Sequence, residues 1–328
     1  IGELLDSELN RLIEVKELSL DDAIEEINRL GDYTMYWNKH TYNPFMLTDR
    51  AISNAYDRFF KKQKKKAFDH VKEEIYYDGI TSVIEAVSKI QDLIKPILVQ
   101  PKHSESIAFG IAHWLWLVKR NLYGLKTECQ IAIGFINEGF EEETGQGSGK
   151  TTLVENICSP FTSKKFGQFL FSNTQLSELT DNRTWGDLLS KIISFLDDLS
   201  PESRHDVATL KSVLTCQGSK SFRALYSKVM SNVKVTLSVI FTANTENFGD
   251  IIKDTTGNRR YLPIHVKEIK RFIPKNLDFI PFWKMIDHKW DCFINQKMFR
   301  DINKQNMTKT SIELLLDQYG VEPWQKGS

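Results

Sequence analysis

The segment that offers the most chemistry is Gly145-Gln146-Gly147-Ser148-Gly149-Lys150-Thr151-Thr152. Small, flexible residues ahead of a Lys-Thr pair allow backbone N–H groups to turn inward around a polyphosphate. The lysine then reaches the outer phosphates, and the first threonine hydroxyl can ligate Mg²⁺. The spacing predicts a nucleoside triphosphate site whose contacts come from Gly145, Gly147, Ser148, Gly149, Lys150, Thr151 and Thr152.

Two features depart from the usual phosphate loop. Thr144 stands where such a loop opens with glycine, and Glu141 to Glu143 place negative charge on the approach to a polyanion. The alternative is a glycine-rich surface turn that happens to precede a lysine. An apolar pattern of helical spacing begins at Leu153 and favours the phosphate loop.

Two carboxylates follow the next apolar run. Ile192 to Leu196 is typical of a buried strand and leads directly into Asp197 and Asp198. A carboxylate at the end of a core strand can hold Mg²⁺ directly or through water, and an adjacent one can polarise the attacking water. We therefore predict that Asp197 binds the metal and that Asp198 activates water. The alternative is a strand followed by an acidic turn.

Polar groups after the following strand extend this pattern. Asn244 ends the run that begins at Val239 and could hold the attacking water near the γ-phosphate, although asparagine is also common in turns. Arg259 and Arg260 come after a tight turn. A guanidinium aimed at the γ-phosphate stabilises transition-state charge and often comes from a neighbouring subunit. The alternative is a pair of structural arginines in salt bridges.

Cations alternate with aromatic residues between the acids and Asn244, in the segment Ser219 to Lys228. This mixture suits a loop or hairpin that follows single-stranded nucleic acid, with cations on phosphates and a ring available to a base. The alternative is an exposed turn with solvated lysines. The predicted DNA contacts are Lys220, Arg223, Tyr226 and Lys228. A lysine run, Lys61 to Lys66, is either a solvated helical face or a second phosphate-contacting patch.

The elements that must position these residues fall into three parts. Residues 1–125 show helical spacing, with one stripe from Val83 to Ile94 and another from Ile107 to Val118. Residues 126–266 alternate short apolar runs with helices, which indicates an α/β layer with a largely parallel sheet. Residues 267–328 return to helical spacing, in which Ile286, Trp290 and Phe293 form a stripe.

The first strand, Ile131 to Ile136, sits some residues too early to lead directly into the phosphate loop. Either a small hairpin intervenes or this strand boundary is wrong.

Composition narrows the class of protein. The 328 residues are 41% hydrophobic and carry 43 basic and 43 acidic side chains, which indicates a globular protein of about two domains. Segregated charges can still bind nucleic acid at zero net charge. No C-x-x-C pair, signal peptide or apolar run of about 18 residues occurs, so we expect free thiols, a cytoplasmic location and no membrane span. The chain opens on Ile1 rather than Met, so we expect an excised piece of a longer protein.

Three pieces of the sequence resemble the superfamily 3 helicases, a viral and plasmid branch of the AAA+ ATPases, and most of all the virulence-associated protein E family of phages and mobile islands. They are the phosphate loop Gly145 to Lys150, the arginine-tyrosine segment Ser221 to Tyr226, and Asp254 to Ile264. The third is the most specific because it contains the run Thr-Gly-Asn-Arg-Arg-Tyr. The resemblance covers roughly residues 45 to 295.

This resemblance implies an AAA+ core with a helical N-terminal domain and a small helical C-terminal part. It also implies a hexameric ring that hydrolyses ATP with Mg²⁺ between subunits and moves single-stranded DNA through a central channel. On that reading Asn244 senses the γ-phosphate, Arg260 or secondarily Arg259 acts from the next subunit, and Lys220, Arg223 and Lys228 line the channel. Many relatives carry a primase domain upstream or an origin-binding domain downstream.

Two other functions remain open from the sequence. One is an ATP-gated DNA-binding or loading module that assembles on DNA without unwinding it. The other is a small-molecule kinase that uses the same loop as a monomer.

Overall fold

The computed structural model describes residues 49–137, 148–175, 178, 188–199, 204–215, 219–222, 231–244 and 260–293. The chain forms two compact units, Ile1–Asp69 and His70–Ser328, and the long helix α3 (Asp49–Glu74) crosses the division. The second unit contains the sheet and also residues 70–125, which the sequence assigned to a separate helical domain. The fold described below is that of the second unit.

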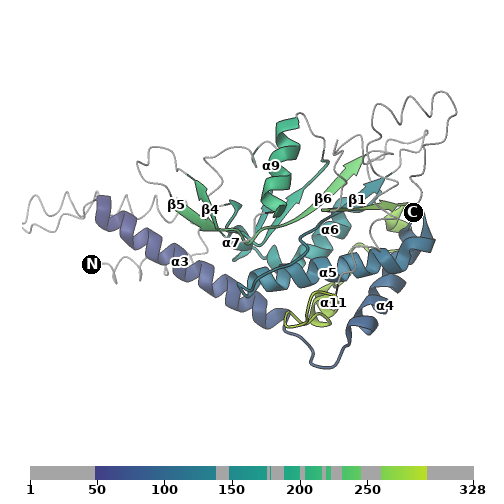
Figure 1. Ribbon diagram of the computed structural model, residues 1–328. Helices are drawn as coiled ribbons and strands as arrows, with labels where there is room; N and C mark the ends of the chain where they lie inside the picture. Colours follow the sequence, from purple (N-terminus) through teal and green to yellow (C-terminus); the bar gives the residue numbers. More distant parts are fainter. Residues whose placement is uncertain are drawn as a thin grey trace, which may run out of the picture. The chain divides into compact units, whose positions relative to one another are not determined.

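A five-stranded parallel sheet forms the centre of this unit (Figure 1). Its strands, in spatial order, are β2 (Phe171–Asn173), β3 (Ile193–Leu196), β6 (Ser238–Asn244), β1 (Ala132–Asn137) and β7 (Tyr261–Val266). The inner strands are continuous apolar runs because both faces of a parallel sheet are covered by helices. Since all five strands run the same way, their carboxyl ends meet at one edge of the sheet.

Helices cover the two faces of the sheet. One face packs against α9 (Arg204–Thr215) through a cluster that includes Leu210, Val213 and Phe241. The other face carries α5 (Ser104–Leu122), whose Trp114 indole donates a hydrogen bond to the Val239 carbonyl over 2.9 Å. Figure 1 shows α9 and α5 on opposite sides of the strands.

A glycine in β1, the strand next to the central strand β6, allows close packing on the α9 face. A Cβ atom on Gly134 would lie 1.9 Å from the ring of Phe241 on the neighbouring strand β6. That ring is fully buried, so it has no room to move away. Glycine is therefore required at this point of β1.

Shorter elements complete the unit. Helix α4 (Val83–Ile94) follows its N-cap Ser82, whose hydroxyl accepts a hydrogen bond from the Glu85 N–H. Of the apolar stripe expected from the sequence it buries Val87, Ile90 and Ile94, while Val83 is half-buried. The remaining helical elements are α6 (Lys150–Cys158), α7 (Gly167–Leu170), α11 (Ile280–Lys284), η2 (Lys95–Ile97), η3 (Pro101–His103), η4 (Ser159–Phe161) and η6 (Ile269–Arg271). Strands β4 (Ser219–Phe222) and β5 (Ser231–Lys234) pair antiparallel as a separate two-stranded sheet.

The α/β fold with a parallel sheet is confirmed, and three predicted strands correspond to β1, β3 and β6. The helical stripe predicted at Ile286, Trp290 and Phe293 is wrong, because α11 ends at Lys284 and the chain then runs through turns. The side chain of Ile286 is buried, but the backbone around it is irregular. The spacing of aromatic and aliphatic residues alone did not distinguish a helix from an irregular segment with buried side chains.

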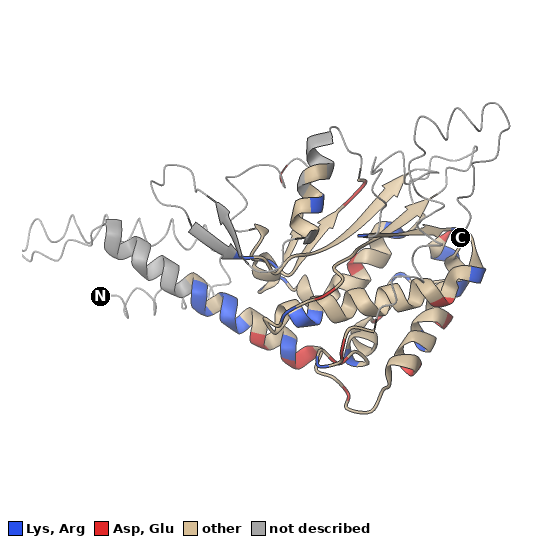
Figure 2. Cartoon of the chain, viewed as in Figure 1, with Lys and Arg blue, Asp and Glu red and all other residues tan. Residues whose placement is uncertain are grey.

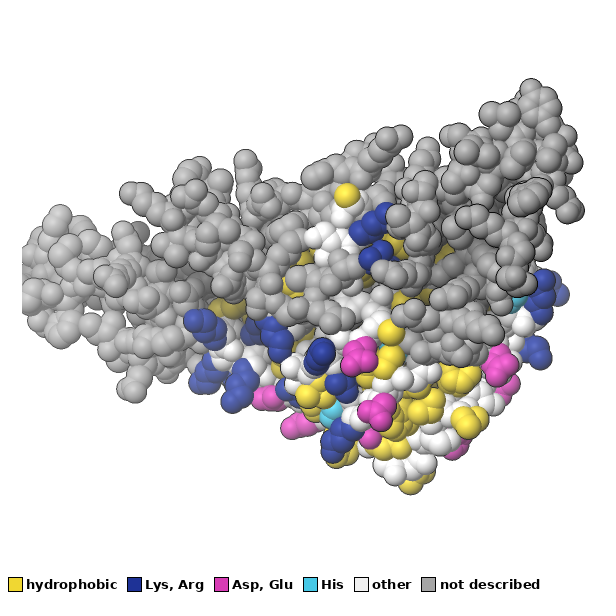
Figure 3. Space-filling view, viewed as in Figure 1, with side chains coloured by type: hydrophobic (Ala, Val, Ile, Leu, Met, Phe, Trp, Pro, Cys, Tyr) yellow, Lys and Arg dark blue, Asp and Glu magenta, His cyan; other side chains and the backbone are white. Residues whose placement is uncertain are grey.

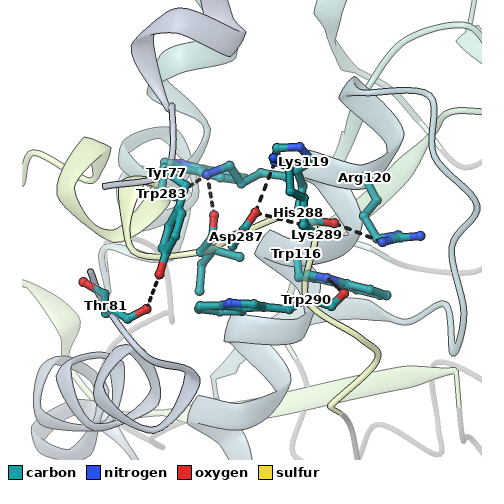
Figure 4. A network of polar contacts seen from close by, with 11 residues as sticks. Tyr77, Thr81, Trp116, Lys119, Arg120, Trp283, Asp287, His288, Lys289 and Trp290 are labelled. Carbon is teal, nitrogen blue, oxygen red and sulfur yellow. Dashed lines mark hydrogen bonds and ion pairs between the residues drawn. The ribbon is translucent and has the colours of Figure 1, made fainter. Parts of the chain in front are cut away.

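A polar network holds this irregular segment against α5 (Figure 4). The buried Lys119 ammonium donates to the carbonyls of Trp283, over 2.9 Å, and Ile286, over 2.5 Å. Arg120 donates to the carbonyl of His288, and the Trp116 indole donates to that of Trp290. These side chains from a regular helix satisfy carbonyls of the irregular segment, those of Ile286, His288 and Trp290, and add a second donor to the Trp283 carbonyl at the end of α11.

Charged and apolar side chains are distributed unevenly on the surface. Figure 2 shows lysines following one another along α3, where Lys61, Lys62 and Lys65 are exposed. Figure 3 shows apolar side chains gathered on part of one face, and the most exposed large apolar residues include Ile80 at 86% and Ile84 at 78%. Within the described residues, none of the helices has the length and hydropathy of a membrane span.

Candidate functional site

A left-handed glycine starts the helix that follows the predicted phosphate loop. Gly149 has φ 95° and precedes α6, whose first residue is Lys150. A Cβ atom on Gly149 would lie 3.1 Å from the Lys270 side chain, so both the backbone conformation and the space favour glycine. The carbonyl of Ser148 accepts a hydrogen bond from the Ile269 N–H over 3.0 Å. The described end of the loop is therefore attached to η6.

The predicted lysine, acids and amide meet at the carboxyl edge of the sheet. Lys150 Nζ donates to Asn244 Oδ1 over 2.5 Å, and Asn244 Nδ2 donates to Asp198 Oδ1 over 2.9 Å. Thr151 Oγ1 donates to Asp197 Oδ1 over 3.1 Å. These five residues come from α6, the end of β3 and the end of β6, which is the neighbour of β3 in the sheet. They were predicted from separate parts of the sequence, and the fold brings them together.

Thr242 also belongs to this cluster, and the sequence analysis missed it. Its buried hydroxyl donates to Asp197 Oδ1 over 2.6 Å and accepts from the Asp198 N–H over 2.9 Å. A signal was present, because residues two apart on a strand share a face and Thr242 lies two before Asn244. Because Thr242 lies inside a run of apolar residues, the sequence analysis treated it as a core residue of the strand.

A cavity of about 740 Å³ opens over the cluster. Its polar wall includes Lys150, Thr151, Thr152, both aspartates and Asn244. Its other wall comes from η6 and the residues after it, and contains Ile269, Lys270, Ile273, Pro274 and Lys275. A volume of this size, lined by a few polar groups and by apolar side chains, is typical of a site for a nucleotide-sized ligand. The wall from η6 onward, which holds three apolar residues and two lysines, was not foreseen from the sequence.

Burial changes the ionisation of the lysine. Desolvation lowers the pKa of Lys150 below its usual 10.5, while the negative charges of Asp198 and Asp197 partly oppose this shift. The side chain is 6% exposed. A cation held in such a place, with the Asn244 amide oxygen as a hydrogen-bond partner, favours the arrival of negative oxygen atoms.

The donor set fits Mg²⁺. In proteins this ion is bound through one or two carboxylates together with phosphate oxygens and water, and a threonine hydroxyl completes the set in phosphate-loop sites. Asp197 and Thr151 lie within hydrogen-bond distance of each other beside the lysine. These two residues would hold the ion, which would neutralise charge on bound phosphates.

Arg260 lies at the opposite edge of the sheet. Its carbonyl accepts a hydrogen bond from the Ala132 N–H, at the amino end of β1, and β7 then runs parallel to β1 as far as Val266. At about 3.3 Å per residue, six residues separate this arginine from the carboxyl edge by roughly 20 Å. Its guanidinium therefore cannot reach the cavity of its own chain.

Several predicted residues carry no structural description. Gly145, Gly147 and Arg259 lie outside the described residues, as do Arg223, Tyr226 and Lys228 between β4 and β5. Lys220 is on β4, in register with Val233 on β5. The predicted DNA-contacting segment thus begins with β4, which pairs antiparallel with β5 beyond the end of the segment, and the roles of its side chains stay a prediction.

The fold and the cluster define an α/β protein with a glycine-led helix facing acids at the carboxyl edge of a parallel sheet. The Virulence-associated protein E-like domain matches residues 141–309, more than half of the chain, and the chain belongs to this family. Among curated proteins, none matches the sequence.

Solved structures match the chain at low similarity. The apo structure of the NrS-1 C terminal region is 14% identical with a TM-score of 0.46, and the match covers 74% of this chain and 56% of that one. The X-ray structure of JCV helicase is 14% identical with a TM-score of 0.31, and the match covers 68% of this chain and 60% of that one. The chain thus spans little more than half the length of the NrS-1 region.

Proposed function

We propose that this protein is an ATP hydrolase that acts as a hexameric, ring-shaped replicative helicase on single-stranded DNA of a mobile genetic element. The observation that carries the proposal is the meeting of Lys150, Thr151, Asp197, Asp198 and Asn244 at one cavity. Membership of the virulence-associated protein E-like family agrees with it. Each of these residue types has a distinct task in phosphoryl transfer to water.

The binding step uses the lysine and the helix start. The N–H groups at the start of α6 and the Lys150 ammonium would bind the β- and γ-phosphates, and Thr151 and Asp197 would hold Mg²⁺. The hydrogen bond between Lys150 and Asn244 is then exchanged for one to phosphate, which leaves the amide oxygen of Asn244 available to a water molecule. Ile269, Ile273 and Pro274 offer an apolar surface for the nucleoside end.

The chemical step uses the second carboxylate and the amide. Asp198 accepts a proton from the attacking water, while Asn244 orients that water toward the γ-phosphorus. The two side chains already touch, because Asn244 Nδ2 donates to Asp198 Oδ1. One water molecule between them would be in contact with both.

The stabilising arginine comes from a second copy of the chain. Because Arg260 is at the far edge of its own sheet, it can serve a cavity only across a subunit boundary. In a ring, each subunit can place this edge of its sheet against the cavity of the next subunit. Arg260 of one subunit would then reach the phosphates bound by its neighbour. The hairpin that contains Lys220, together with Arg223, Tyr226 and Lys228, would face the DNA, where cations bind phosphates and a ring stacks on a base.

Hydrolysis by the Lys150→Ala variant tests the nucleotide site. We expect ATP turnover to fall to background, whereas Lys102→Ala, which removes an exposed lysine of η3, should match the wild type. Turnover of the Lys150→Ala variant near that of the wild type would remove the phosphate-loop assignment.

Displacement of a labelled strand then separates the proposed helicase from the loading module. Unwinding that requires ATP supports the helicase. DNA-stimulated hydrolysis without strand displacement supports an ATP-gated loader. A monomer whose ATP turnover is indifferent to DNA would favour a kinase of the same fold.

A further inference from the structure

One threonine connects both carboxylates of the site. Thr242 Oγ1 donates to the Asp197 carboxylate and accepts from the Asp198 N–H. The Thr242 carbonyl in addition accepts from the Leu199 N–H over 2.7 Å. Three successive residues after β3 are thus bound to a single residue of β6, which is the neighbouring strand.

The backbone of the second acid needs such support. Asp198 has φ 52°, in the left-handed region that residues with a side chain rarely adopt. A conformation of this kind persists where the surroundings overdetermine it, and it occurs preferentially at functional sites. The Thr242 hydroxyl binds the N–H of this residue, so it holds the turn that aims the Asp198 carboxylate at Asn244.

The same hydroxyl orients the first acid. Asp197 Oδ1 accepts from Thr242 over 2.6 Å and from Thr151 over 3.1 Å. Two donors on one oxygen fix the rotation of the carboxylate about its terminal bond. Partners that orient a metal-binding carboxylate typically influence metal affinity or activity by about 10- to 100-fold.

From this geometry we infer that Thr242 is a positioning residue of the proposed ATPase: its hydroxyl assigns the two adjacent aspartates to different tasks, Asp197 to the metal and Asp198 to water. This inference rests on the proposed function. It goes further by naming a residue that acts on Mg²⁺ and water through the two aspartates that its hydroxyl holds.

The test compares Thr242→Val, which keeps the shape and removes the hydroxyl, with Thr242→Ser, which retains it. Thr236→Val is the matched control, because Thr236 Oγ1 donates over 2.9 Å to the Lys191 carbonyl at the amino end of the strands, away from the cavity. The measurements are kcat and KM for ATP, the Mg²⁺ concentration at half-maximal turnover, and binding of fluorescent ADP with Mg²⁺ or with EDTA.

For Thr242→Val we expect kcat to fall and the Mg²⁺ requirement to rise by about 10-fold or more, with binding in EDTA unchanged. The Thr242→Ser and Thr236→Val variants should behave like the wild type. Wild-type kcat and Mg²⁺ dependence in a folded Thr242→Val variant would overturn the inference, as would equal loss in Thr242→Ser. If Thr242→Val does not fold, Thr242→Cys replaces the strong hydroxyl donor by a weak thiol donor and undergoes the same measurements.

The outcome for the wild type separates the two proposals. If the wild type hydrolyses ATP and Thr242→Val does so equally well, the positioning role fails and the proposed function stands. If the wild type neither hydrolyses ATP nor binds fluorescent ADP, the proposed function fails, and the role of Thr242 fails with it.

Discussion

Replacing Lys119 by methionine should change how the stability of this protein depends on pH. The ammonium group is fully buried and donates to two carbonyls of the 283–286 segment. Burial lowers the pKa of Lys119 from 10.5 to about 7, although Asp287 and Asp78 oppose this shift. In the unfolded chain the lysine returns to its ordinary pKa, so between these two values the unfolded state binds more protons than the folded state.

Stability must therefore rise with pH across this window. One proton of difference is worth about 1.4 kcal/mol per pH unit. Since Lys119 is still half protonated at its folded pKa of about 7, the gain from pH 7 to pH 9 is about 2 kcal/mol. For a unit of this size that corresponds to about 4–8 °C in Tm. The cost of the buried charge is fully present below pH 7 and is relieved above it.

Thermal melts of the wild type and Lys119→Met between pH 7 and 9 measure the effect. The difference between the two proteins isolates Lys119, because neighbouring groups titrate elsewhere: the pKa of His288 is lowered from 6.5, and those of Tyr77 and Tyr123 are raised from 10.0. The control Lys89→Met removes an exposed lysine and should follow the wild type. A Tm difference that stays constant from pH 7 to 9 would refute the argument.

Three other substitutions test the site and its supports. Gly149→Ala places a side chain at φ 95°, so we expect nucleotide affinity to fall by about fivefold or more. The control Gly124→Ala is also at positive φ but away from the cavity, so it should change stability and leave nucleotide binding intact. Equal nucleotide affinities in the two variants would contradict this expectation. Arg260→Ala should bind ATP and fail to turn it over, with partial rescue on mixing with the phosphate-loop lysine variant; no rescue at any ratio would exclude action across subunits. Trp283→Phe removes a 2.8 Å hydrogen bond from the indole to the Ile157 carbonyl at the end of α6. We expect the free energy of unfolding to fall by about 1–2 kcal/mol, which thermal melts would measure. An unchanged Tm would show that this hydrogen bond contributes nothing to stability.

Local pattern was sufficient to predict the parallel sheet and the polar ends of its strands. Buried parallel strands are continuous apolar runs, and the residues that follow them lie at the same edge of the sheet. The sequence alone therefore indicates that Asp197 and Asn244 belong to one site. Lys150 joined them because its helix follows β1. These inferences depend on periodicity and strand direction, which a sequence displays directly.

The parts that could not be predicted depend on contacts between distant segments. The η6 wall of the cavity is more than 100 residues from Lys150, and no pattern in it indicates a ligand. Apolar residues of the irregular 285–293 segment have helical spacing. The carbonyls of Ile286, His288 and Trp290, however, accept hydrogen bonds from side chains of α5. Arg260 could be suspected of meeting a phosphate, but its distance from its own cavity required the register of β7 against β1.

The attachments of α6 have a mechanical consequence. The residues just before it are bound to η6 through the Ser148 carbonyl, and its far end is bound to Trp283 through the Ile157 carbonyl. The stretch of chain from 269 to 283 thus forms hydrogen bonds at both ends of α6, a helix about 13 Å long. Hydrogen bonds at both ends limit the fraying of this helix. A displacement of its first turn by a ligand is therefore coupled to Trp283 at its far end.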